Sequence, residues 1–129
     1  MTNMHPETHH TDQIARVAQA LKLLSVEARL RILALLRERD LCVGALTCRL
    51  GLTQGAVSQH LKLLREAGLV TAKRAGTYVH YRVNQDRLDE WLRQIGGLLV
   101  QLHARTGDGD AAAEANPARC KKRQKERCA

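Results

Sequence analysis

The sequence predicts a mainly α-helical protein with one small β-hairpin. The chain has 129 residues, which is enough for one domain plus tails. Aromatic residues make up only 2% and phenylalanine is absent, so the core must be aliphatic, which favours packed helices over a β-sandwich. Apolar residues recur at steps of three and four along most of the chain, with one switch to alternation after Gly68.

The first two predicted helices begin at polar residues that can cap them. Apolar residues at helical spacing predict an amphipathic helix from Asp12 to Leu24, with Asp12 as its N-cap. We expect Ser25 to cap a second helix that ends near Asp40. Residues 1–11 are then a flexible, histidine-containing N-terminal arm. The apolar positions of the two helices are Ile14, Val17, Ala18, Leu21 and Leu24, then Val26, Leu30, Ile32, Leu33 and Leu36.

The next two segments have the spacing of a helix-turn-helix. A short third helix fits Val43–Leu50, and Gly51 suits the left-handed position that often follows a helix. Thr53 can cap a fourth helix from Gln54 to Ala67, and Gly68 closes it. Two helices joined by a short turn that contains glycine are typical of this motif. The residues expected to face the core are Val43, Leu46 and Leu50, then Val57, Leu61 and Leu64.

A hairpin and a long helix follow. Residues 69–74 and 78–83 are two β-rich runs around a glycine turn, which predicts a hairpin. A last helix is expected from Asp86 to about Thr106, with an apolar seam that suits a partner helix. Gly96-Gly97 interrupts this seam, either as a weak spot or kink or as a point of close approach to another helix.

Charge and motifs narrow the function. The formal net charge of +8 predicts a polyanionic partner, and residues 53–84 are strongly basic. No apolar run is long enough to span a membrane and no signal peptide is recognisable, so we expect a cytoplasmic protein that does not contact membranes. The sequence has no phosphate-binding loop, nucleophile elbow or zinc-protease motif, so we do not expect an enzyme.

The order helix, helix, helix-turn-helix, hairpin and long helix is that of a winged helix-turn-helix domain, here residues 12–106. Residues 107–129 have no apolar period and are expected to form a disordered basic tail that contains cysteines. The stretches LTQGAVSQHLKLLREAGLV (52–70) and RAGTYVHYR (74–82) resemble the ArsR/SmtB family of small bacterial repressors, and most closely its arsenic-responsive branch. This resemblance runs over residues 14–106 and implies a homodimeric transcriptional repressor that binds an imperfect palindrome in operator DNA.

The outer side of the fourth helix is the expected reading surface. Burial of its apolar side leaves polar residues that can reach base edges and phosphates in a major groove. Gln54 and Gln59 can pair with adenine edges, and Gly55 lets the backbone approach the sugar-phosphate chain. His60 is either structural or a phosphate contact, and the resemblance favours the contact. The expected DNA-binding residues are Thr53, Gln54, Gly55, Ser58, Gln59, His60 and Lys62, with Lys73, Arg74 and Arg82 flanking the hairpin tip.

One recognition helix reads only a few base pairs, so useful specificity requires two copies of the domain on a palindrome. The seam of the last helix, completed by the first helix, is the expected dimer contact. The predicted dimerisation residues are Ile14, Val17, Leu21, Leu88, Trp91, Leu92, Ile95, Leu99 and Leu102.

Four cysteines without a secretion signal are expected to be reduced thiols, available to metals or redox chemistry. The resemblance implies a repressor released by an inducer, which the arsenic branch binds through Cys-Val-Cys near the start of the third helix and a further cysteine. Cys42 matches the first ligand, whereas Gly44 and Thr47 occupy the other two places and Cys48 is displaced by one residue. Cys42 and Cys48 share a face only if Cys42 lies before the helix. The expected ligands are Cys42, Cys48, Cys120 and Cys128, and the inducer is As(III) or Sb(III) ahead of Cd(II), Pb(II) or Zn(II), with no constitutive cofactor.

Other signals remain open at this point. His5, His9 and His10 either join Cys42 in a mixed thiolate and imidazole site or have no role. Asp86 and His103 match only part of the zinc site that the resemblance implies for the last helix, which disfavours that site. A repressor of this kind without a metal site would respond to thiol redox state or to a small metabolite. Outside DNA binding, the alternative is a basic module that binds a protein or RNA.

Overall fold

The computed structural model describes the backbone of residues 6–104 and the side chains of residues 12–104. The chain divides into two compact units after Leu98, and of the second unit only the end of the last helix is described. The elements in order are α1 (Pro6–Leu24), α2 (Glu27–Glu38), β1 (Leu41–Cys42), α3 (Val43–Leu50), α4 (Gln54–Glu66), β2 (Val70–Ala75), β3 (Tyr78–Val83) and α5 (Gln85–His103). The expected fold class, mainly helical with a small hairpin, is confirmed.

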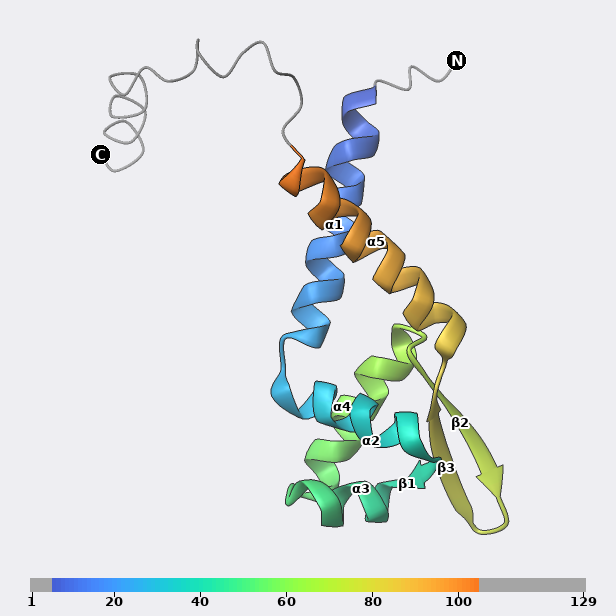
Figure 1. Ribbon diagram of the computed structural model, residues 1–129. Helices are drawn as coiled ribbons and strands as arrows, with labels where there is room; N and C mark the ends of the chain where they lie inside the picture. Colours follow the sequence, from blue (N-terminus) through green and yellow to red (C-terminus); the bar gives the residue numbers. More distant parts are fainter. Residues whose placement is uncertain (1–5, 105–129) are drawn as a thin grey trace, which may run out of the picture. The chain divides into compact units, whose positions relative to one another are not determined.

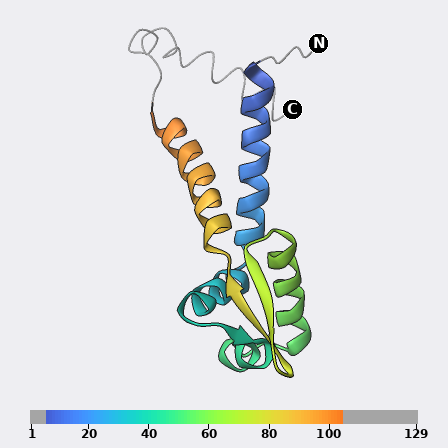
Figure 2. The same ribbon diagram turned by 90° about the vertical axis from the view of Figure 1, so that its right-hand side faces the viewer.

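The hairpin is part of a three-stranded antiparallel sheet with the order β1-β3-β2. The first strand, β1, was not predicted because two residues are too few to show alternation. It pairs Leu41 with Tyr81 and Cys42 with His80, so it covers only the middle of β3. The tip of the β2–β3 hairpin therefore extends past β1 (Figure 2).

The core is aliphatic, as expected, and lies where α2, α3 and α4 pack beside the sheet (Figure 1). The three predicted inward residues of α4 are all buried, as is Leu46 of α3. Gly51, with φ of 67°, adopts the left-handed conformation between α3 and α4, and its N–H donates to the carbonyl of Thr47 at 3.0 Å. The helix-turn-helix prediction is thus confirmed. The fully buried larger side chains are Ile32, Leu46, Val57, Leu61, Leu64 and Leu69.

Three predicted helix starts need correction. The first helix begins at Pro6 rather than Asp12, because proline suits the first turn of a helix, so His9 and His10 lie within α1 instead of an arm. Ser25 does not cap α2: its hydroxyl donates to the carbonyl of Lys22 at 2.8 Å, and Val26 is the N-cap. The last helix begins at Gln85, one residue before Asp86.

Two further differences concern single positions. Leu30, one of the apolar positions of the predicted second helix, is 50% exposed, because Ile32, Leu33 and Leu36 form the buried stripe of α2. Helix α5 runs unbroken through Gly96-Gly97 and ends at His103, three residues before the expected end.

Among residues 6–104, no helix has the length and apolar character to cross a membrane.

Candidate nucleic-acid interface

Helix α4 has two faces of opposite character. Val57, Leu61 and Leu64 are buried in the core, so the residues on the other side face outward. The helix begins at Thr53, whose hydroxyl accepts a hydrogen bond from the N–H of Ala56 at 3.2 Å. The exposed row, which we call the reading row, consists of Gln54, Gly55, Ser58, Gln59 and Lys62.

The start of α4 suits an anionic partner. Its first turn contains no acidic residue, so the positive end of the helix dipole is not neutralised there. Thr53 is itself exposed beside this helix end. Backbone N–H groups at such a position are suitable donors to a phosphate.

His60 differs from its neighbours because it faces α2. Its Nδ1 accepts a hydrogen bond from Nε of Arg29 at 3.3 Å, and the side chain is half-buried. Burial and then the nearby Arg29 charge lower the pKa of His60 below its ordinary value of 6.5. Arg29 also donates to the carbonyl of Leu23 at 3.0 Å. Of its two expected roles, the observed contacts support the structural one, in which His60 joins α4 to α2.

The hairpin has basic side chains both near its tip and near its base. Lys73 and Arg74 are exposed near the tip, where Arg74 pairs with Val79 in the register. Arg82 pairs with Thr71 near the base of the hairpin and does not flank the tip, contrary to expectation.

The strand register places Arg82 away from the tip, and an ion pair holds its side chain there. Its Nη2 lies 3.0 Å from Oδ2 of Asp40, and its Nε lies 3.4 Å from Oδ1 of the same carboxylate. Asp40 belongs to the connection between α2 and β1, so the pair fastens this connection to β3. No sequence signal indicated the contact, because the two residues are distant in the chain.

The structure describes two of the four cysteines, and both are free. Cys42 is half-buried and extended at the N-cap of α3, which satisfies the condition for sharing a face with Cys48. Its Sγ lies 3.9 Å from where a Cβ on Gly44 would be. Cys48 is exposed. Cys120 and Cys128 lie outside the described residues.

No complete metal site is formed by the side chains that the structure describes: they contain no cluster of three or more His, Cys, Asp or Glu residues suited to an ion. Cys42 and Cys48 would need a donor from elsewhere to make a three-thiolate site. Asp86 and His103 lie in the first and last turns of α5, far apart along that helix. His5 lies outside the described residues, and for His9 and His10 only the backbone is described.

Most of the predicted dimerisation residues are open to solvent in the single chain. Leu92 is 69% exposed, and Ile14 and Leu21 of α1 are nearly half exposed. Leu99 and Leu102, in the last turns of α5, are also exposed. Val17 is the exception because it is 2% exposed and belongs to the interior of the single chain. Leu88, Trp91 and Ile95 are half-buried.

A helix-turn-helix with an exposed polar row, flanked by a hairpin with exposed Lys73 and Arg74, defines a winged helix-turn-helix DNA-binding protein. Residues 27–72 match the family described as "Bacterial regulatory protein, arsR family". The transcriptional activator HlyU of Vibrio cholerae is 36% identical over 89 residues, which cover 69% of this chain and 82% of HlyU. The chain therefore belongs to the arsR family.

Two further relatives extend the comparison. The arsenical resistance operon repressor of Escherichia coli is 41% identical over 78 residues, 60% of this chain and 66% of that protein. The solution structure of the homodimeric winged helix-turn-helix DNA-binding domain Mb0332 of Mycobacterium bovis superposes with a TM-score of 0.55 at 28% identity, covering 83% of this chain and 94% of that domain. These relatives regulate transcription or bind DNA, so the family is one of regulators and not of enzymes.

Proposed function

We propose that this protein is a cytoplasmic, homodimeric repressor that binds an imperfect palindrome in operator DNA and leaves it when a thiophilic metalloid, As(III) or Sb(III), binds to its cysteines. The observation that carries the DNA-binding part is the reading row of α4, which is exposed along its whole length. Beside it lies the β2–β3 hairpin with Lys73 and Arg74, which we call the wing.

The reading row supplies the chemistry for base recognition. Gln54 and Gln59 each carry an amide that can pair with N6 and N7 of adenine, and the Ser58 hydroxyl can donate to a base or phosphate. A Cβ on Gly55 would meet nothing within 4 Å, so at this point the helix backbone is open to a close partner. Lys62, together with Lys73 and Arg74 of the wing, supplies charges for phosphates on either side.

A dimer is needed to make this readout specific. Two copies of α4 spaced by about one turn of DNA, roughly 34 Å, would contact two half-sites of a palindrome. The exposed Ile14, Leu21 and Leu92 supply an apolar surface suited to a second copy. The homodimeric state of the similar Mycobacterium bovis domain supports this assembly.

The position of Cys42 suits an inducer site that controls DNA binding. Cys42 ends β1, which pairs with wing strand β3 at His80, and it directly precedes α3, which packs against α4. A displacement of Cys42 would therefore reach both DNA-binding elements. A trivalent metalloid held by thiolates supplies a short covalent link between cysteines. Cys48 is the second expected donor, and Cys120 and Cys128 are the candidates for a third. The similarity to an arsenical resistance repressor supports the choice of inducer.

The DNA-binding part is tested by fluorescence anisotropy on the DNA upstream of the protein's own gene. Gln54→Ala and Ser58→Ala should each weaken operator binding by about 1–3 kcal/mol while leaving binding to random duplex nearly unchanged. The matched control is Gln85→Ala, because Gln85 is also an exposed glutamine at the first position of a helix. Equal losses on operator and random DNA would contradict direct readout and favour a general basic module.

The inducer part is tested by adding arsenite, antimonite, cadmium, lead and zinc in turn to the reduced protein–DNA complex. Arsenite or antimonite should release the DNA, and Cys42→Ser and Cys48→Ser should each abolish the release. A chain truncated after Thr106 shows whether the tail cysteines take part. Gly44→Cys is a positive control, because it adds a thiol beside Cys42. Tight DNA binding that no ion reverses would contradict the metal site and direct the search to oxidants and metabolites.

A further inference from the structure

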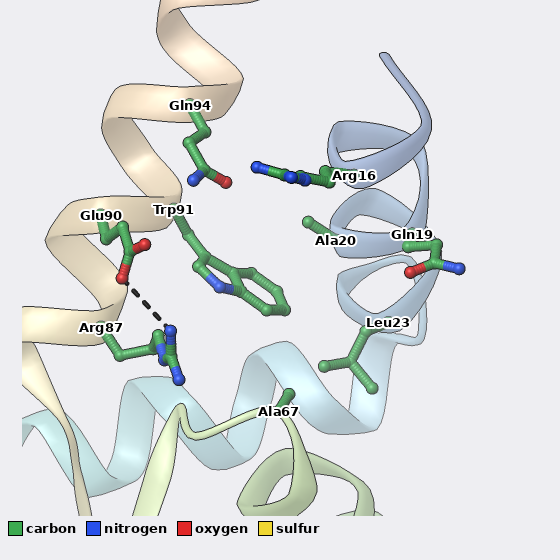
Figure 3. Close-up of a pocket in the computed structure, with 9 residues that line it drawn as sticks. All are labelled: Arg16, Gln19, Ala20, Leu23, Ala67, Arg87, Glu90, Trp91 and Gln94. Atoms are coloured by element: carbon green, nitrogen blue, oxygen red, sulfur yellow. Dashed lines mark hydrogen bonds and ion pairs between the residues drawn. The ribbon is translucent and has the colours of Figure 1, made fainter. Parts of the chain in front are cut away.

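A pocket of about 420 Å³ opens between α1, α5 and the end of α4 (Figure 3). This volume lies within the range of small-molecule sites in proteins. The pocket lies apart from the reading row and from Cys42 and Cys48, since none of these residues lines it. Its lining belongs entirely to the first compact unit.

One wall of the pocket is the indole ring of Trp91. The ring projects from α5 toward α1, with Ala20 and Leu23 on the opposite side and Ala67 nearby (Figure 3). These small and aliphatic side chains leave room in front of the indole ring. Such an arrangement suits a flat apolar group stacked on the indole.

The polar part of the lining contains two arginines, each in an ion pair with a carboxylate. Arg16 extends from α1 toward Gln94 of α5 across the pocket (Figure 3). Its partner, Asp12, lies 3.2 Å away in an ion pair whose side chains are 69% and 64% exposed. An exposed pair of this kind contributes little, so a carboxylate from solution can replace Asp12 at low cost.

Arg87 lies beside Gly68 at the end of the pocket nearest Ala67 (Figure 3). Its Nε would lie 2.9 Å from a Cβ on Gly68, so the guanidinium lies directly against this glycine at the end of α4. It also forms an ion pair with Glu90 at 3.3 Å. Two arginines and one glutamate line the pocket, and Asp12, which pairs with Arg16, balances the remaining positive charge until an anion replaces it.

Trp91, one of the predicted dimerisation residues, lines the pocket, but on α1 the pocket does not face the exposed Ile14 and Leu21. On α1, Leu23 follows the exposed Leu21 by two residues, a rotation of about 200° around the helix axis. Arg16 likewise follows Ile14 by two residues. A partner that covers Ile14 and Leu21 would therefore lie on the side of α1 opposite the pocket.

We propose that this pocket binds a small planar organic anion, with its ring stacked on Trp91 and its carboxylate on Arg16. The amides of Gln19 and Gln94 provide further hydrogen-bond partners at the rim. The proposal does not depend on the metalloid site, and it provides a location for a small-molecule signal.

The test uses the full-length reduced protein and three probes of the same shape: benzoate, neutral benzamide and cationic benzylammonium. Trp91 is the single tryptophan of the chain, so the tryptophan fluorescence comes from a residue that lines this pocket. Benzoate should change the fluorescence saturably at millimolar concentration or below, with the same affinity by calorimetry. Benzamide and benzylammonium should bind at least about tenfold more weakly, because they lack the charge that pairs with Arg16.

Three variants test whether Arg16 is the cation that binds the carboxylate of benzoate. Arg16→Gln should weaken benzoate binding about tenfold, whereas Arg93→Gln, an exposed arginine of α5 outside the pocket, should leave it unchanged. Asp12→Asn frees Arg16 and should leave binding equal or tighter. Circular dichroism of each variant confirms that the fold is retained. Benzylammonium binding as tight as benzoate binding, equal losses in the two arginine variants, or no saturable benzoate response would each overturn the proposal.

Discussion

Among single residues, His60 lies on the recognition helix α4 but stabilises the packing of that helix against α2. Its Nδ1 must be unprotonated to accept the hydrogen bond from Arg29, and its pKa is lowered first by burial and then by the Arg29 charge. Protonation would therefore break the link from α4 to α2. The neighbouring Gln59 is exposed and makes no such contact with the core.

The pH dependence of stability follows from this environment. The unfolded chain takes up a proton at His60 near pH 6.5, whereas the folded protein does so only at lower pH. The contribution of His60 to stability is therefore present above about pH 6.5 and is lost as the pH falls below it. His60→Gln should reduce the loss in urea midpoint between about pH 7.5 and about pH 5.5. The control, His103→Gln at the exposed end of α5, should retain it, and equal behaviour of both variants would contradict this role.

A substitution at Gly55 should weaken DNA binding without reducing the stability of the fold. Alanine at this helical position meets no atom within 4 Å, so Gly55→Ala should leave thermal stability unchanged or raise it by up to about 1 kcal/mol. The added methyl group would separate the backbone from the sugar-phosphate chain, and operator affinity should fall by about tenfold. Gly44→Ala, at an exposed helical glycine in α3 whose added methyl group would make only an ordinary contact with Cys42, is the matched control for the stability gain without the affinity loss. Unchanged operator binding by Gly55→Ala would refute the close approach.

At the scale of elements, the wing divides into a tip and a base with different tasks. The tip extends past β1 and carries Lys73 and Arg74, whereas the base is tied to the body through Arg82 and Asp40. Residues Val70 and Val83 anchor the hairpin in the core. The basic residues of the wing are therefore not equivalent.

The salt dependence of DNA binding should reveal this division. Lys73→Gln and Arg74→Gln should each lower the slope of log affinity against log salt by about 0.9. Arg82→Gln should change the slope much less, because Asp40 already neutralises its charge, and should cost under about 1 kcal/mol of stability. The slopes come from anisotropy titrations at several salt concentrations. A loss for Arg82→Gln as large as that for Lys73→Gln would show that Arg82 contacts phosphate.

At the scale of the whole molecule, the apolar residues left outside the core are concentrated in the first and last helices. Leu92 is 69% exposed and Leu21 is 45% exposed, although both carry large aliphatic side chains. Such exposure is costly in water and is relieved when a second surface covers it. The proposed dimer supplies that surface.

Leu92→Glu should convert the protein to monomers, because it places a charge in an apolar contact. Sedimentation equilibrium gives the mass, and circular dichroism should show unchanged helix content, since Leu92 lies outside the core. Operator affinity should fall at the same time. Ala34→Glu, at an exposed position of α2, is the control and should stay dimeric. A dimeric Leu92→Glu protein would place the interface elsewhere.

Interactions between residues close together in the chain could be predicted from the sequence, and much of the secondary structure depends on such interactions. The cap at Thr53, the left-handed Gly51 and the buried stripe of α4 all depend on residues a few positions apart, so composition and period predicted them. The row opposite that stripe was predicted for the same reason. Helix starts were predicted less reliably: the Ser25 hydroxyl donates to the carbonyl of Lys22 instead of capping α2, because a serine hydroxyl can bond to the backbone on either side of it.

The order of elements, the aliphatic core and the outward face of α4 could be predicted from the sequence, because each follows from spacing along one helix or strand. The pairing of Arg82 with Asp40, the contact of Arg29 with His60 and the pocket in front of Trp91 could not be predicted in this way. These features join residues from separate elements. Their formation depends on how the elements pack, which no local period in the chain encodes.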